Sequence, residues 1–162
     1  MWIYLEQFSI ILGAIYIPPS NSKYYNDDLF DELLDDISYI MSIYDAPFLL
    51  MGDFNSRTGQ LDDVLDDIDL DLLHINDMYV DDVGPYNLPS NTINKRVNKD
   101  VTTNESGLKL IELCQVVNFN IVNGRVGRDN AMGDYTCHKY NGKSVIDYAV
   151  ASRSLFPLIT DL

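Results

Sequence analysis

The stretch Pro47-Phe-Leu-Leu-Met-Gly-Asp-Phe-Asn55 places the strongest constraint on how this chain can fold. Its apolar run, Phe48–Met51, is typical of a short strand that is buried on both faces. If the chain stays extended beyond that run, Asp53 and Asn55 point to one face of the sheet, and Phe54 points into the core. A carboxylate and an amide at the end of a buried strand are suited to holding water, a metal ion or a phosphate. The same two residue types are also common in simple turns.

The segments before this stretch predict a strand and then a helix. The strand is expected at Ser9–Ile17, where an apolar run ends at two prolines. The helix is expected at Tyr25–Tyr44, because apolar residues recur there at helical spacing and Asn26 or Asp27 is placed to cap the first turn. The order strand, helix, strand predicts an α/β domain.

The second half of the sequence predicts one more helix and three more strands. The helix is expected at Thr102–Val117, with two alternative caps: a capping box of Thr102 with Glu105, or Asn104 alone. The strands are expected at Phe119–Val122, Tyr135–Tyr140 and Lys143–Ala151. Asn-Gly at 141–142 lies between the last two strands and is a strong signal for a two-residue hairpin.

The charge of the chain is strongly acidic, with a formal net charge of −14. A surface of this charge repels nucleic acid and by itself argues against a nucleic-acid-binding function. The acidic residues concentrate in Asp27–Asp36 and Asp62–Asp82, however, so individual surfaces can differ from the average. Two small basic patches are expected, one formed by Lys95, Arg96 and Lys99 and the other by Arg125 and Arg128.

Cysteine usage and hydropathy indicate a reducing compartment. Cys114 and Cys137 lie in apolar contexts and are expected to be core thiols. The apolar run Ser9–Ile17 is too short to span a bilayer, and no export signal is recognised. We therefore expect an intracellular protein, nuclear or cytoplasmic, with no membrane partner.

Several separated stretches of the chain occur in the order that one protein family shows. They are Gly13-Ala-Ile-Tyr-Ile-Pro-Pro-Ser20, Phe48-Leu-Leu-Met-Gly-Asp-Phe-Asn-Ser-Arg-Thr-Gly59, Arg96 to Asp100 with Asn104 and Gly107, Asn120-Ile-Val-Asn-Gly124, Gly133-Asp-Tyr-Thr136 and Ser144-Val-Ile-Asp-Tyr148. Together they resemble the endonuclease/exonuclease/phosphatase superfamily, and most closely the endonuclease domain of non-LTR retrotransposons. The resemblance implies a DNase I-like two-sheet α/β sandwich that cuts DNA by attack of water on a phosphodiester.

The resemblance also implies three catalytic residues and a metal cofactor. Asp53 would orient or deprotonate the attacking water and would bind the metal ion. Asn55 would hold the phosphate oxygens as charge develops, and Asp147 would orient a catalytic histidine. Such a reaction needs hydrogen-bond donors, a cation and a base. Hard oxygen ligands and phosphate chemistry favour Mg²⁺ or Mn²⁺.

Four further residues are expected to contact the substrate, which the resemblance implies is DNA. Tyr16 would touch the scissile phosphate, and Thr136 and Ser144 would line the DNA groove. Arg57 is a further candidate for a phosphate contact, although a surface arginine without such a role is the commoner case. A covalently linked reverse transcriptase domain is the partner that the resemblance implies in the full-length product.

The sequence departs from the family pattern near both ends. The family asparagine and metal-binding glutamate precede the Tyr16 strand, and Glu6 lies too close to Tyr16 to take that role. The family Ser-Asp-His motif is also not found, and neither His74 nor His138 matches it. We therefore expect the chain to represent the middle and late part of such a domain. The alternative is a catalytically inactive remnant that acts as an interaction module. A hydrolase that acts on a phospholipid headgroup or another small phosphoester ranks last.

Overall fold

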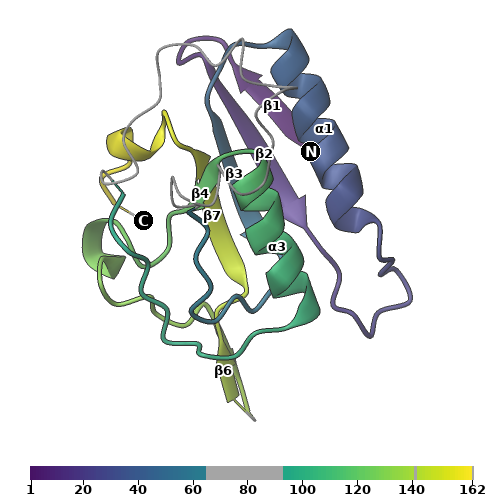
Figure 1. Ribbon diagram of the computed structural model, residues 1–162, viewed down its shortest axis with the longest axis vertical. Coiled ribbons are helices and arrows are strands. Elements are labelled where there is room, and N and C mark those ends of the chain that lie inside the picture. The colour runs from purple at the N-terminus through teal and green to yellow at the C-terminus, as the bar shows by residue number, and fades with distance from the viewer. Residues whose placement is uncertain (65–92, 141, 162) are drawn as a thin grey trace, which may run out of the picture.

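A five-stranded mixed sheet forms the centre of the structure, with the strand order β1-β2-β3-β7-β4. The computed structural model describes residues 1–64, 93–140 and 142–161. The strands of this sheet are β1 (Trp2–Leu5), β2 (Ile10–Tyr16), β3 (Phe48–Asp53), β4 (Phe119–Ile121) and β7 (Asp147–Ser152). Helices α1 (Leu29–Ile43) and α3 (Glu105–Val116) lie side by side over one face of the sheet, as Figure 1 shows. The chain is thus a mixed α/β fold.

The segment from β2 through α1 to β3 confirms the predicted strand–helix–strand unit. β2 and β3 pair in parallel, from Ile11 opposite Phe48 to Tyr16 opposite Asp53. Antiparallel partners can be joined by a tight turn, but parallel neighbours need a crossover, and α1 provides it. The predicted caps of α1 are wrong, because the helix begins after Asp28, and Asn26 Oδ1 instead accepts a hydrogen bond from the Asp28 N–H.

β3 is the central strand, and its apolar side chains form much of the core. Phe48, Leu50 and Phe54 are completely or almost completely buried, which confirms the predicted interior strand. Gly52 has a φ of 151°, and a Cβ atom there would collide with the carbonyl oxygen of Ile15 on β2. The close approach of β2 and β3 therefore requires glycine at this position.

The sheet face opposite the helices is only partly covered. A second cluster of buried side chains, among them Ala149, Ala151 and Phe156, covers the part of this face near β7. On β1 and β3 the same face leaves Ile3 and Met51 exposed. β3 is consequently buried on its helical face and half open on the other, which corrects the expectation of burial on both faces.

The predicted hairpin is present, but both of its strands are shorter than predicted, and Gly142, predicted in the turn, pairs with Lys139 as the first residue of the second strand. β5 (Cys137–Lys139) and β6 (Gly142–Ser144) form a separate two-stranded sheet, and Figure 1 shows it projecting from the main body. The chain then leaves this hairpin and enters the main sheet as β7, between β3 and β4. The described residues thus form one five-stranded sheet and one hairpin, so the two-sheet sandwich stays a prediction.

Two local features differ from the sequence expectations or go beyond them. β1, which pairs antiparallel with β2, was not predicted. The cap of α3 is Asn104, whose Oδ1 accepts a hydrogen bond from the Gly107 N–H, so the capping box of Thr102 with Glu105 is wrong. Cys114 is buried in the core, and burial raises its pKa well above the ordinary value. Cys137 is half-buried on the hairpin and so is not the core thiol expected.

No helix in the described part of the chain is long and apolar enough to cross a membrane. Most of the predicted acidic stretch Asp62–Asp82 lies outside the described residues.

Candidate functional site

Three of the predicted site residues form one row across the sheet. Tyr16 on β2 lies opposite Asp53 on β3, and Asp53 lies opposite Asp147 on β7. Side chains of directly opposed residues project to the same face of a sheet. Tyr16 is exposed and the two aspartates are half-buried, so this row, at the end of β3, is accessible to solvent.

Asn55 lies next to the row but does not share its face in the way predicted. The strand ends at Asp53, and Asn55 has a φ of 46°, so the chain turns there instead of staying extended. The turn is held by a hydrogen bond of 2.9 Å from the Asn55 N–H to Asp53 Oδ1 and by another of 2.9 Å from Asn55 Nδ2 to the Ile17 carbonyl. The turn that these residue types favour is thus confirmed, and a role of the pair in holding water, a metal ion or a phosphate stays a prediction.

Thr136 holds the point where the chain passes from the hairpin into β7. Its Oγ1 accepts hydrogen bonds of 3.1 Å from the backbone N–H groups of Ile146 and Asp147. Ser144 lies at the end of β6, and its carbonyl accepts a hydrogen bond from the Thr136 N–H. These two residues therefore lie beside the row and connect the hairpin to it.

Arg57 is not a solvated surface arginine. Its Nε and Nη2 donate hydrogen bonds of 2.8 and 2.6 Å to the two carboxylate oxygens of Asp100. The hydrogen bond to Asp100 raises the pKa of Arg57. Burial raises the pKa of Asp100, but its hydrogen bonds outweigh burial, and that pKa lies below the ordinary value. Arg57 lies four residues after Asp53, and the Nε–Nη2 edge of its guanidinium is engaged by Asp100.

The two basic patches predicted from the sequence are wrong, because most of their cationic side chains are buried or paired with carboxylates. Arg125 is buried and donates two hydrogen bonds of 2.7 Å to the carboxylate of Asp63. Arg96 is also buried, with its Nε 3.8 Å from the same carboxylate. Lys99 and Arg128 pair with Asp134 and Asp161. Of the two patches, only Lys95 lies exposed without an ion pair to another described residue.

Arg96 belongs to a buried polar network that sequence reasoning missed. Its Nη1 donates a hydrogen bond of 2.9 Å to Thr58 Oγ1, which lies 3.1 Å from the hydroxyl of Tyr148. The Tyr148 hydroxyl in turn donates to the carbonyl of Val145. Burial lowers the pKa of Arg96 and raises that of Tyr148. Tyr148, which follows Asp147 on β7, is thus hydrogen-bonded into this network.

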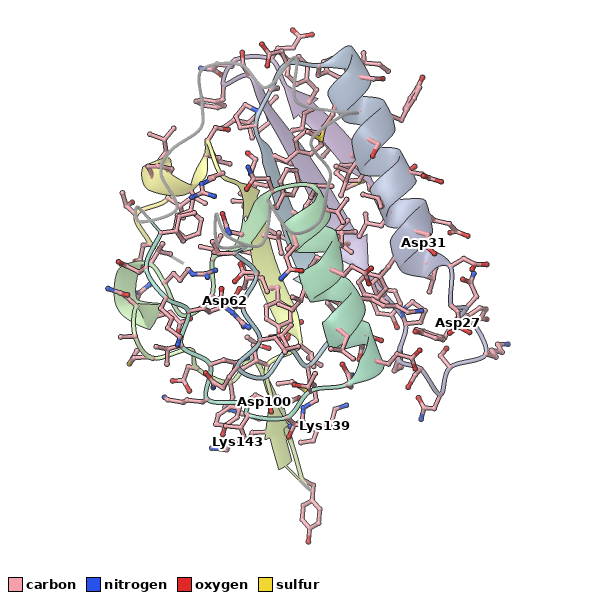
Figure 2. All side chains as sticks on the ribbon, in the orientation of Figure 1. Asp27, Asp31, Asp62, Asp100, Lys139 and Lys143 are labelled. Atoms are coloured by element: carbon pink, nitrogen blue, oxygen red, sulfur yellow. The ribbon has the colours of Figure 1, made fainter. Side chains whose placement is uncertain are left out.

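Two lysines that no carboxylate of the described part engages lie on the hairpin that leads into β7. Lys139 and Lys143 come from β5 and β6, and Figure 2 shows both at the lower end of the view. Asp27 and Asp31 lie at the beginning of α1, on the right of the same view. These two lysines and these two aspartates thus lie on different parts of the surface.

The chemistry of the row is that of two neighbouring carboxylates and a phenol. Mg²⁺ is usually bound through one or two carboxylates, with water and substrate phosphate completing its octahedron. Asp53 and Asp147 are suited to such a partial donor set. Within the described ranges, no group of three or more His, Cys, Asp or Glu side chains is placed to enclose a metal ion.

Comparisons with known proteins give no independent identification. No protein-family model matches the chain, and no curated protein matches it. The functional argument therefore depends on the geometry of the site and on the sequence motifs.

Proposed function

We propose that this chain is the greater part of a Mg²⁺- or Mn²⁺-dependent DNA endonuclease domain, which works beside a covalently linked reverse transcriptase in a longer polyprotein. The single observation that carries this proposal is the row of Tyr16, Asp53 and Asp147 on three adjacent strands. Residues separated by up to 131 positions in the sequence meet at one accessible end of the sheet, where the Asn55 amide joins them. Such a meeting is typical of a functional site.

The residues of the row have distinct chemical capacities. The Asp53 carboxylate can orient a water molecule and accept its proton, using the oxygen that the Asn55 N–H does not engage. The Asn55 side-chain nitrogen has one N–H on Ile17 and a second to donate to a phosphate oxygen. The Tyr16 phenol can donate to the same phosphate. A metal ion held by Asp53 and Asp147 would neutralise charge on the phosphate oxygens.

The open sheet face supports the two-sheet sandwich that the family resemblance implies. Ile3 and Met51 lie exposed on the face opposite the helices, at 44% and 49% of their full surface. Large apolar side chains exposed together on a sheet face are suited to packing against a second layer. We propose that further strands of the full domain cover this face, next to the row.

The hairpin supports DNA as the substrate. Its lysines Lys139 and Lys143 accompany His138 and the fully exposed ring of Tyr140, on an arm that leaves the sheet just before Asp147. Lysine and aromatic side chains on one projection are suited to contacts with phosphates and bases. The arm places these contacts close to the proposed cutting site.

Plasmid nicking by the longest natural protein that contains this chain tests the proposal. We expect Mg²⁺-dependent nicking of supercoiled DNA, and we expect Asp53→Ala to abolish it by removing the carboxylate that holds water. Asp45→Ala serves as the control, since it also removes one negative charge, but Asp45 is exposed and precedes β3, at the end of the strand opposite Asp53. Nicking at the full rate by the Asp53→Ala variant would contradict the proposal.

A second candidate function is a non-catalytic interaction module. The ion pairs favour it, because Arg57, Arg96, Arg125 and Arg128 are bound to carboxylates and the chain carries a net charge of −14. This candidate predicts no DNA binding at moderate salt and no stabilisation by Mg²⁺. Mg²⁺-dependent nicking by the 162-residue chain itself would refute it.

A further inference from the structure

Asp100 is the most heavily engaged carboxylate near the row, and it is almost completely buried. It accepts two hydrogen bonds from the Arg57 guanidinium, and one of 3.1 Å each from the backbone N–H groups of Thr102 and Val145. Only 2% of its side-chain surface is exposed. A buried charge of this kind is tolerated because every oxygen is satisfied.

Two of the three residues that donate to Asp100 come from the segments that carry the site aspartates, and the third, Thr102, lies on the same loop as Asp100. Arg57 follows Asp53 by four residues, and Val145 precedes Asp147 by two. Asp100 itself lies on the loop before α3, and Figure 2 shows it at the end of the molecule where the hairpin begins. One side chain thus bridges the exit of β3 and the entrance of β7.

We propose that Arg57 and Asp100 are positioning residues, which fix the segment of Asp53 and Asn55 relative to Asp147. This inference rests on the proposed function and names residues beyond the row that the reaction depends on. The ion pair does not touch the substrate. It acts by holding Val145, and therefore the start of β7, against the turn that follows Asp53.

The geometry favours this role over a direct phosphate contact by Arg57. A guanidinium that grips a phosphate uses two parallel N–H groups, and here Nε and Nη2 are both directed at Asp100. The Arg57 backbone is fixed as well, because its N–H donates a hydrogen bond of 2.8 Å to Asn104 Oδ1. Turning this Nε–Nη2 edge toward a phosphate would leave the buried Asp100 without its main partner.

The test compares Arg57→Lys, Asp100→Asn and the double variant in the longest natural protein that contains the chain. Arg57→Lys keeps the charge but loses the two-pronged geometry. Asp100→Asn keeps the shape but loses the negative charge. Because displacements of about 1 Å can slow a reaction up to roughly 100-fold, we expect kcat for nicking to fall about 10- to 100-fold in each variant. We expect KM for DNA to stay within about twofold, because substrate contacts are unchanged.

The double variant separates positioning from substrate binding. Two residues that act as one unit give a double variant about as slow as the slower single variant. If Arg57→Lys instead raises KM, or if the two effects on kcat multiply, Arg57 acts on DNA independently and the proposal is overturned. Arg128→Lys is the matched control, since Arg128 also pairs with a carboxylate, Asp161, and is expected to leave kcat and KM unchanged.

Amide hydrogen exchange tests the same proposal without any activity. In Arg57→Lys we expect faster exchange at Val145, Ile146 and Asp147, because Asp100 no longer holds this segment in place. If the natural protein does not nick DNA, the proposed function fails while this measurement still decides the positioning role. Unchanged exchange at all three amides would overturn it. If Asp100→Asn does not fold, the exchange measurement on Arg57→Lys alone still tests the positioning role.

Discussion

Two aspartate–arginine pairs in this molecule are both joined by two hydrogen bonds but have very different surroundings. In the pair of Arg125 with Asp63, the exposed fractions of the two side chains are 1% and 0%. In the pair of Arg57 with Asp100, Asp100 is 2% exposed but Arg57 is 33% exposed. The first pair is sealed inside the fold, and the second extends from the interior to the accessible end of the sheet.

The partners of each pair show what the difference means. Asp63 also accepts the backbone N–H of Ile121 on β4 and lies 3.8 Å from Arg96, so two guanidinium groups depend on it. Removing it would leave two buried cations. Asp100 instead connects Arg57 to the segment that enters β7. We infer that the sealed pair mainly secures the fold, whereas the half-open pair mainly sets the geometry of the candidate site.

The largest effect is expected for Asp63→Asn. Removing the charge of one partner leaves the other charges buried without a counter-ion, so we expect the free energy of unfolding to fall by about 3–5 kcal/mol. Urea denaturation measures it. Asp62→Asn is the control, because Asp62 is 55% exposed and lies 3.9 Å from Arg125, and we expect about 0–1 kcal/mol there. Equal losses in the two variants would remove the distinction between the pairs.

A smaller effect, dependent on pH, is expected for Arg57→Gln. Hydrogen bonds to a buried charge contribute about 1.5–3 kcal/mol, and Arg57 is partly open to solvent, so we expect a loss of about 1–3 kcal/mol at pH 7. The pKa of Asp100 lies below its ordinary value of 3.8. The ionised Asp100 therefore contributes its full share to the free energy of unfolding above about pH 3.8. That share is lost as the pH falls through the pKa that Asp100 has in the folded protein.

The difference between wild type and Arg57→Gln should accordingly shrink in acid. Urea denaturation at a series of pH values from neutral to about 3 measures it. A difference that stays constant down to the acid limit would show that Asp100 is not the charge on which Arg57 depends.

The smallest effect is expected for Arg128→Gln, which breaks a pair on the surface. Arg128 is 86% exposed and lies 3.2 Å from Asp161. Exposed pairs contribute little, so we expect a change of about 0.5 kcal/mol or less, and less still at high salt. Thermal unfolding at two salt concentrations checks this. A loss as large as that of Asp63→Asn would mean that pairing, and not burial, determines the energetics.

The regular elements of the fold were predictable wherever the signal was local. The apolar run Phe48–Met51 and the helical spacing in α1 depend on neighbouring residues, and both predictions are confirmed. The division of Lys143–Ala151 into β6 and β7 was not predictable from periodicity. It depends on the hydroxyl of Thr136, which accepts hydrogen bonds from the backbone N–H groups of Ile146 and Asp147. These bonds lie where the chain passes from the hairpin into the main sheet.

The sequence predicted the residues of the candidate site better than it predicted their surroundings. The motifs picked out Tyr16, Asp53 and Asp147, and strand pairing brings them together. The burial of Arg96 and Arg125 was not predictable, because their partner Asp63 lies 33 and 62 positions away in the sequence. The predicted basic patches assumed that the arginines lie in solvent. Pairing with a carboxylate so distant in the sequence makes that assumption wrong for Arg96 and Arg125.

The order of the strands has a consequence for how the protein is made. β3 pairs with β2, which precedes it closely, and with β7, which follows nearly 100 residues later. During synthesis the ribosome releases the first partner long before the second. Tyr16 and Asp53 can thus meet early, but Asp147 can join them only when β7 inserts between β3 and β4. Formation of the row would then show that the nascent chain has completed its sheet. Pairing across so many residues should make this step slow.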